Sequence, residues 1–291
     1  MKQVNRKIPS IDGKGLMLGI PAYTDDLAEA NSLIVKVLRR PHTYAKIISI
    51  DTESALNIDG VECVLTHKDF KRIPFTRAGQ GYPEPSPHDK FVLDEYVRYV
   101  GDEVCVVAAI SNQICDQALD VINVEYEILD PVLDLEKAID NESCIHPEPE
   151  IHEMFPIGFE PKRNIAASYK MEVKNVEEEL SKCDVVVEET FYTQAQQHMM
   201  MEPMTVNAIM DFQDRLVLYS ATQTPVHVRR ILSQTLEIPL SRIRVIKPRV
   251  GGGFGGKQAL HGEMFVSAVT MKTGKPSKMV FTRKEVFEST Y

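Results

Sequence analysis

The chain has 291 residues, 43% hydrophobic and 26% charged, a composition typical of folded globular proteins that excludes a disordered or collagen-like chain. Its 33 basic and 42 acidic residues give a net charge of −9, which disfavours nucleic acid as a partner. The longest apolar run, residues 104–110, is far shorter than the roughly twenty residues that cross a bilayer. Residues 1–14 also lack the apolar core of a secretory signal. The sequence therefore predicts a cytoplasmic protein without a membrane span.

The first half of the chain is predicted to contain strands with one helix. Residues 33–39 and 45–51 are rich in β-branched side chains, and residues 60–65 alternate after an Asp-Gly turn, so a small sheet is expected here. Residues 72–89 carry a group of prolines, each of which removes a backbone donor and fixes φ. This segment is predicted to be an ordered surface excursion.

A β-α-β unit is indicated over residues 100–129. Residues 100–110 form a nearly continuous apolar strand of the kind that is buried on both faces. The helical spacing of Ile114, Ala118 and Val121 predicts a helix after it, and residues 124–129 return to a strand pattern.

Two domains are expected, because a single hydrophobic core stops growing near about 250 to 300 residues; the alternative is one large α/β unit. A second group of prolines, between residues 147 and 161, indicates the boundary. We therefore predict a first domain over residues 1–145, a linker over 146–170 and a second domain over 171–291. The second domain is expected to be incomplete, since its last residues supply no closing layer.

The second domain reads as strands followed by helices. Thr224 and Pro225 offer an N-cap and a first-turn proline, and Gly274 offers a C-terminal stop. The predicted elements are strands over 185–192, 205–211 and 216–221, a helix after Pro225, a strand over 243–247 and a helix over 261–272.

The most informative segment is the glycine loop, residues 251–258, with the sequence GGGFGGKQ. Glycines let the backbone approach a ligand closely, and their amides can converge on anionic oxygens, which predicts a phosphate-bearing cofactor. The loop satisfies the G-x-G-x-x-G dinucleotide pattern, but too few residues follow it to complete that fold. It also satisfies most of the P-loop pattern, but Gln258 stands where a hydroxyl must bind magnesium.

The segments around this loop resemble the molybdenum-cofactor-binding subunit of the xanthine dehydrogenase and aldehyde oxidase family. The likeness is greatest to bacterial xanthine dehydrogenases whose molybdenum subunit is a separate polypeptide. Three further segments resemble the family's small hammerhead domain. The segments that carry the resemblance are 197–203, 221–225 and 244–258 for the molybdenum domain, and 22–27, 39–47 and 99–103 for the hammerhead domain.

The resemblance implies an α+β fold, with a hammerhead domain followed by the first part of a molybdopterin-binding domain. It implies a molybdenum cofactor held by molybdopterin or its cytosine dinucleotide. It places the amide of Gln223 against a molybdenum oxo ligand and places Gly253, Phe254 and Gly255 against the pterin. Gln258 occupies a substrate-binding position at which purine-hydroxylating relatives often carry glutamate. No general base is expected in this chain, because in the family it lies further along the subunit.

Each of these residues has a simpler interpretation. Gln223 would be a satisfied amide beside a helix start, and Phe254 would be a core anchor. Lys257 is expected to be either a phosphate contact or an exposed lysine at a helix start. His198 and Glu202 are expected to be structural support rather than metal ligands, because methionines separate them and Pro203 favours extended backbone.

The implied reaction is hydroxylation of a carbon next to nitrogen, on a purine or related N-heterocycle, with water as the oxygen source. The implied partners are an iron–sulfur subunit, an FAD subunit and a polypeptide supplying the rest of the molybdenum domain, in a homodimeric assembly. This chain itself has five cysteines without C-x-x-C spacing. The alternatives are a non-catalytic or truncated pseudo-subunit and a P-loop nucleotide-binding protein.

Overall fold

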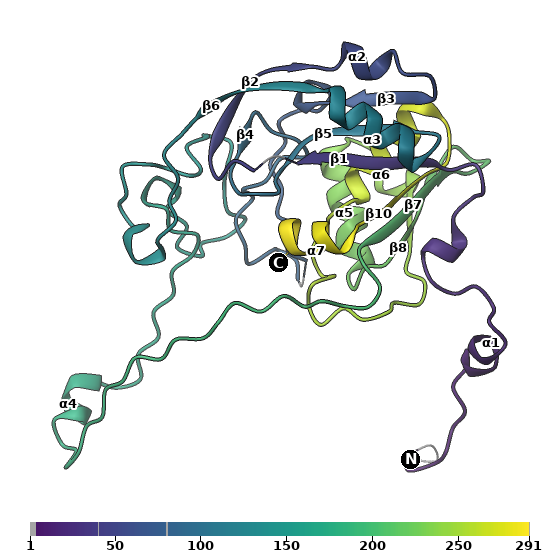
Figure 1. The fold of residues 1–291 in the computed structure, drawn as a ribbon. Helices are drawn as coiled ribbons and strands as arrows, with labels where there is room; N and C mark the ends of the chain where they lie inside the picture. Colours follow the sequence, from purple (N-terminus) through teal and green to yellow (C-terminus); the bar gives the residue numbers. More distant parts are fainter. Residues whose placement is uncertain (1–3, 40, 80, 291) are drawn as a thin grey trace.

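The computed structural model describes residues 4–39, 41–79 and 81–290 (Figure 1). The helices are α1 Gly13–Met17, α2 Glu53–Leu56, α3 Asn112–Val121, α4 Val176–Leu180, α5 Pro225–Thr235, α6 Glu263–Thr273 and α7 Arg283–Ser289. The strands are β1 Leu33–Arg39, β2 Ala45–Asp51, β3 Val61–Leu65, β4 Tyr96–Val97, β5 Glu103–Ala109, β6 Asn123–Ile128, β7 Thr205–Met210, β8 Leu216–Ser220, β9 Ile243–Ile246 and β10 Ser277–Val280. Within these residues, every helix is too short or too polar to cross a membrane.

The main sheet has seven strands in the order β3-β5-β1-β10-β7-β8-β9, so it combines strands from both halves of the chain. The junction is a short parallel pairing of β1 with β10, in which Leu33 lies opposite Ser277. The predicted α+β class is confirmed.

Strand β5 shows why the sheet is buried on both faces. All seven of its residues are buried, as the apolar pattern predicts. Val106 and Ala108 face a core that includes residues of α5 and α6, whereas Cys105 and Val107 face a second core that includes residues of α3. Successive side chains of a strand point to opposite faces, so β5 belongs to both cores.

The predicted β-α-β unit over residues 100–129 is wrong in one respect. The element order β5, α3, β6 is present, but β6 leaves the main sheet and pairs antiparallel with β2 in a three-stranded sheet, order β4-β2-β6. The side chains of β6 are exposed or half-buried, with none fully buried. Such a strand suits a small outer sheet and not the centre of a covered one.

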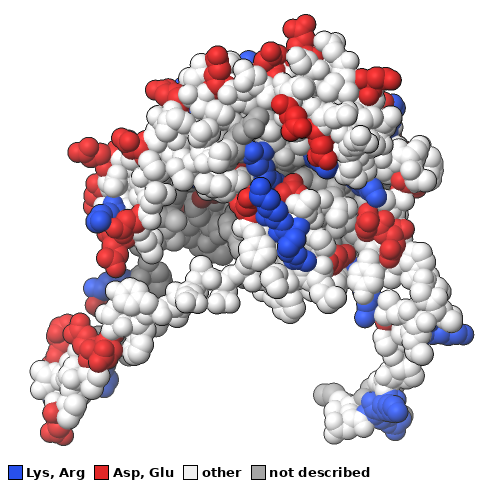
Figure 2. Space-filling model, viewed as in Figure 1, with Lys and Arg blue, Asp and Glu red and all other residues white. Residues whose placement is uncertain are grey.

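The predicted strand over residues 185–192 is also wrong. This segment is extended without strand pairing, and its side chains are exposed. It belongs to a long excursion that carries α4 away from the body of the molecule (Figure 1). Figure 2 shows acidic side chains gathered at the far end of this excursion, where α4 has the sequence VEEEL. The β-branched pattern has no partner edge among the described residues, and a strand needs one.

Candidate functional site

The glycine loop follows β9 and folds back on itself through local hydrogen bonds. Gly252 and Gly255 have φ of 97° and 103°, values that favour glycine. Phe254 has φ of 50°, an uncommon conformation for a bulky residue that marks a constrained turn. The amide of Gly256 donates to the carbonyl of Gly253 at 2.8 Å, which closes the turn around Phe254.

Gln223 is attached to this loop by the acceptor end of its side chain. Its Oε1 accepts hydrogen bonds from the amides of Gly255, at 3.2 Å, and Lys257, at 3.3 Å. Its own backbone amide donates to the carbonyl of Lys257 at 2.8 Å. Because the oxygen faces these two amides, the NH₂ group of the same side chain points away from them. The side chain is exposed, so this NH₂ group remains available as a hydrogen-bond donor. A Cβ on Gly253 would lie 2.5 Å from this Oε1, so any other residue there would displace the Gln223 side chain from this position.

Glu202 and Lys257 support the loop from inside. Glu202 Oε2 accepts from the amide of Gly251 at 2.7 Å and pairs with Lys257 Nζ at 2.8 Å. The Lys257 side chain is 1% exposed, and burial lowers its pKa. The expectation of an exposed helix-start lysine is therefore wrong: the ammonium is buried, and the next helix begins only at Glu263.

His198 and Glu202 lie on backbone without helix, so they do not share a helical face. A Cβ on Gly256 would lie 3.0 Å from the ring of His198, which places this ring directly under the loop. Among the described residues there is no group of three or more His, Cys, Asp or Glu that could hold a metal ion. Both residues contact the loop, Glu202 by hydrogen bonds and His198 by packing.

Phe254 is 75% exposed, so its interpretation as a core anchor is wrong. The amides of Gly252, Gly253 and Phe254 have no protein acceptor within the described part of the chain. Three successive amides without a partner around an exposed ring can bind an anionic oxygen, as backbone nests do. Together with the donor of Gln223 and the close approach of Gly253 to its side chain, they fit a pterin with its anionic metal ligands.

A cavity of about 490 Å³ lies beside the loop. Gly255 and Gln258 form one wall, and the proline-rich segment 76–89 forms the other. The expectation that this segment is a surface excursion is therefore wrong. It packs on α5: buried Glu84 pairs with Arg230 Nε at 3.0 Å, and a Cβ on Gly79 would collide with the ring of His227.

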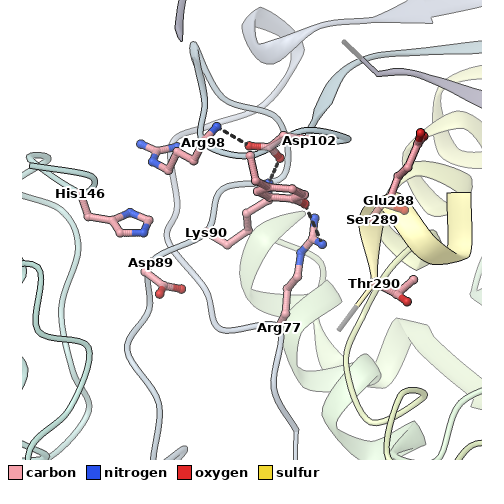
Figure 3. Close-up of a pocket in the computed structure, with 10 residues that line it drawn as sticks. Arg77, Asp89, Lys90, Arg98, Asp102, His146, Glu288, Ser289 and Thr290 are labelled. Carbon is pink, nitrogen blue, oxygen red and sulfur yellow. Dashed lines mark hydrogen bonds and ion pairs between the residues drawn. The ribbon is translucent and has the colours of Figure 1, made fainter. Parts of the chain in front are cut away.

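A second cavity, of about 310 Å³, adjoins the first along the same segment (Figure 3). Asp89 and His146 lie on one side of it, and Glu288, Ser289 and Thr290 lie on the other. Its floor is a network of buried ions that holds the segment to the main sheet. The network pairs Arg77 with Glu103 at 2.5 Å and Lys90 with Glu103 at 2.9 Å, and it also joins Lys90 to Asp102.

Burial shifts the pKa values of several groups in and near the candidate site. It raises the pKa of Asp89 to about 6, and it lowers the pKa values of His146 and His261 to about 3. In contrast, the pKa of Glu103 lies well below its usual range, because its three basic neighbours outweigh its burial. The two histidines are therefore neutral at physiological pH, and Asp89 titrates close to it.

Sequence reasoning missed Asp89, Arg77 and the rest of the wall formed by residues 76–89. The prolines and glycines of this segment indicated a loop, but they did not indicate which part of the fold the loop packs against. One signal was available: Arg77, Glu84 and Asp89 are charged residues within a short proline-rich stretch, and charged residues on ordered loops mark functional sites more often than those on helices do.

Comparison with known proteins agrees with this geometry. A model for the "Aldehyde oxidase and xanthine dehydrogenase, a/b hammerhead domain" matches residues 18–130, and a model for the "Molybdopterin cofactor-binding domain" matches residues 159–291. The chain is 33% identical to the probable hypoxanthine oxidase of Escherichia coli K12, over 99% of this chain and 32% of that protein. It is 32% identical to the nicotinate dehydrogenase large molybdopterin subunit of Eubacterium barkeri, over 94% of this chain and 60% of that protein.

The fold is that of solved molybdenum hydroxylases. The aldehyde oxidoreductase of Desulfovibrio gigas superimposes with a TM-score of 0.82 at 24% identity, covering 97% of this chain and 30% of that one. The chain thus consists of a hammerhead domain and part of a molybdopterin-binding domain. It belongs to the xanthine dehydrogenase and aldehyde oxidase family of oxidoreductases. It spans about a third of the length of the E. coli relative.

Proposed function

We propose that this chain supplies the glycine-loop side of the cofactor site in an enzyme that hydroxylates a purine or related N-heterocycle, with water as the oxygen source. The observation that carries the proposal is the orientation of Gln223. Two loop amides fix its oxygen, so its NH₂ group is left to donate beside three amides that lack a protein partner. The names of the hypoxanthine oxidase and nicotinate dehydrogenase relatives support a heterocyclic substrate.

The residues of this chain would hold and orient the cofactor. The amides of Gly252, Gly253 and Phe254 would bind anionic oxygens, and Gln223 would donate a hydrogen bond to a ligand of the metal. When bound, the molybdenum group supplies a two-electron oxidation of the substrate carbon. Gln258, in the wall of the adjoining cavity, would donate to and accept from a heterocycle.

The proposal includes components outside this sequence. We infer that the general base and the rest of the molybdenum domain come from residues beyond those given, and that the chain alone is inactive. Iron–sulfur and FAD subunits would remove the electrons, in a homodimeric assembly whose cofactor is molybdopterin or its cytosine dinucleotide. We also propose domain boundaries at 1–145, 146–170 and 171–291, which the matched segments 18–130 and 159–291 support.

The P-loop alternative conflicts with the position of Lys257. In a P-loop the lysine must reach the phosphates from the start of a helix. Here its ammonium is buried against Glu202, and no helix starts at the loop. Magnesium-dependent ATP binding is therefore not expected of this loop.

The test is cofactor loading. The chain is co-expressed with its partner polypeptides, and the purified assembly is analysed for molybdenum by mass spectrometry and for pterin by fluorescence after oxidation. We expect both in the wild type, and a loss of at least several-fold in Gln223→Ala. Gln213→Ala, an exposed glutamine in the turn between β7 and β8, is the matched control and should load normally. A correctly assembled wild type with neither molybdenum nor pterin would favour the pseudo-subunit instead.

A further inference from the structure

Asp89 and Gln258 line the same cavity, although 169 positions separate them in the sequence. Gln258 comes from the glycine loop, and Asp89 comes from the segment 76–89 of the hammerhead half. The cavity measures about 490 Å³, within the range of roughly 300 to 1,000 Å³ that is usual for small-molecule sites. A ligand lying against Gly255 would therefore have an amide on one side and a carboxylate on another.

The position of Asp89 is fixed by its two neighbours in the chain. The amide of His88 donates to the carbonyl of His152 at 2.7 Å. The amide of Lys90 donates to the carbonyl of Phe75 at 3.1 Å, and the amide of Phe75 donates back to Lys90 at 2.8 Å. Because both neighbours are bonded to other segments, the backbone of Asp89 is held in place before any ligand binds. Preorganisation of this kind reduces the entropy lost on binding.

The carboxylate of Asp89 is half-buried and forms no ion pair within the described residues. The basic side chains close to it already have partners. Arg77 and Lys90 are paired with Glu103, and Arg98 is paired with Asp94 at 2.7 Å. Burying a carboxylate without a partner is unfavourable, so a residue placed in this way is suited to a ligand that brings a donor.

The remaining cavity walls suit a flat ring. Most of them are small or apolar residues, namely Ala78, Gly79, Pro85, Pro87, Ala166 and Ala259, and the others are the hydroxyl residues Thr76 and Ser86 and the basic residue Arg77. Apolar walls with a few convergent polar groups are the usual composition of a small-molecule site. In this cavity the guanidinium of Arg77 is already paired with Glu103, so the polar groups that we assign to a ligand are the carboxylate of Asp89 and the amide of Gln258.

We propose that Asp89 is a substrate-binding residue, whose carboxylate accepts a hydrogen bond from a ring N–H of the heterocycle while Gln258 contacts the same ring from the glycine loop. This inference rests on the proposed function and deepens it. It assigns substrate selection partly to the hammerhead half of the chain and favours heterocycles that carry an N–H over those that do not.

The experiment compares Asp89→Asn with the wild type in the molybdenum-loaded assembly. A hydrogen bond to a charged group is worth about tenfold or more in affinity. We therefore expect KM for hypoxanthine to rise about tenfold or more, with little change in kcat and unchanged molybdenum content. Asp120→Asn, an exposed aspartate on α3, is the matched control and should keep the wild-type KM.

A second probe separates a hydrogen bond from a general disturbance of the cavity. In 1,9-dimethylhypoxanthine both ring N–H groups are blocked, so its affinity, measured by calorimetry on the loaded assembly, should be the same for the wild type and Asp89→Asn. An equal loss for both probes, an unchanged KM for hypoxanthine, or no binding of hypoxanthine by the loaded wild type would overturn the role of Asp89. A wild type that loads no molybdenum would instead refute the proposed function, so the two failures are distinguishable.

Discussion

At the scale of single residues, Glu202 links the two ends of the glycine loop. One oxygen, Oε2, accepts from the amide of Gly251 and from the ammonium of Lys257. The sequence identified Glu202 as a supporting residue but could not identify Lys257 as its partner. Lysine is almost never fully buried unless it is paired, and the two residues are 55 positions apart. The packing that buries Lys257 forms only in the folded chain.

Glu202→Gln should destabilise the protein. The substitution keeps the shape of the side chain but leaves the buried ammonium of Lys257 without a counter-ion, so we expect a loss of about 3 kcal/mol in the free energy of unfolding. Urea denaturation of the full chain measures it, with the exposed Glu188→Gln as the control. Adding Lys257→Met to Glu202→Gln should recover part of the loss. If Glu202→Gln alone were as stable as the wild type, this result would contradict the ion pair between Glu202 and Lys257.

His261 should make stability depend on pH. Its pKa is about 3 in the folded chain, because burial disfavours the charged ring, against about 6.5 when unfolded. Between these values the unfolded chain binds a proton that the folded chain does not, so stability is lost as the pH falls below about 6.5. From pH 7 to pH 5 the wild type should lose about 2 kcal/mol more than His261→Asn does. Urea denaturation at both pH values measures this difference, and equal losses would show that the ring is protonated in the fold.

At the scale of elements, the sequence predicts best where a whole element is apolar and buried. The apolar run over 100–110 and the helix over 261–272 correspond closely to β5 and α6, because both elements are buried nearly throughout. Pairing is less predictable. The sequence indicates that β6 is a strand, but it does not indicate that its partner is β2 in the three-stranded sheet. The position of residues 76–89 depends on contacts with α5. These contacts join residues far apart in the sequence, so no local pattern predicts them.

Residues 185–192 should show little protection in hydrogen exchange. Their amides have no hydrogen-bond acceptor among the described residues, although the sequence is that of a strand. Exchange of the full chain, followed by mass spectrometry of its peptides, should label this segment at close to the rate of an unstructured peptide, while β5 is labelled slowest. Slow exchange over 185–192 would indicate a pairing that contradicts the fold described above.

At the scale of the whole molecule, one sheet spans the two predicted domains. Strands β1 and β5 come from the hammerhead half, whereas β10 and β7 come from the second half, and a single core contains residues of both. The sequence could not predict this joint sheet, because parallel pairing between β1 and β10 connects residues more than 240 positions apart. The candidate site depends on this arrangement, since its cavity has one wall from each half.

The two halves should therefore unfold together. Cys63, Cys105 and Cys115 are buried in the hammerhead half, and burial raises the pKa values of Cys63 and Cys115 to about 11. In a Cys183→Ser variant, which lacks the exposed thiol, these three should react with a thiol reagent only at the urea concentration at which circular dichroism is lost. Labelling of Cys63 or Cys105 at a clearly lower urea concentration would show that the hammerhead half unfolds separately.

The account depends most on the contact between the glycine loop and the cofactor, and a cryo-EM or crystal structure of the cofactor-loaded assembly tests it directly. The predicted result is a pterin-bound molybdenum against the amides of residues 252–254, with Gln223 Nε2 within hydrogen-bond distance of a ligand of the metal. A loaded structure in which the metal lies elsewhere, and this loop contacts only protein or solvent, would contradict the account.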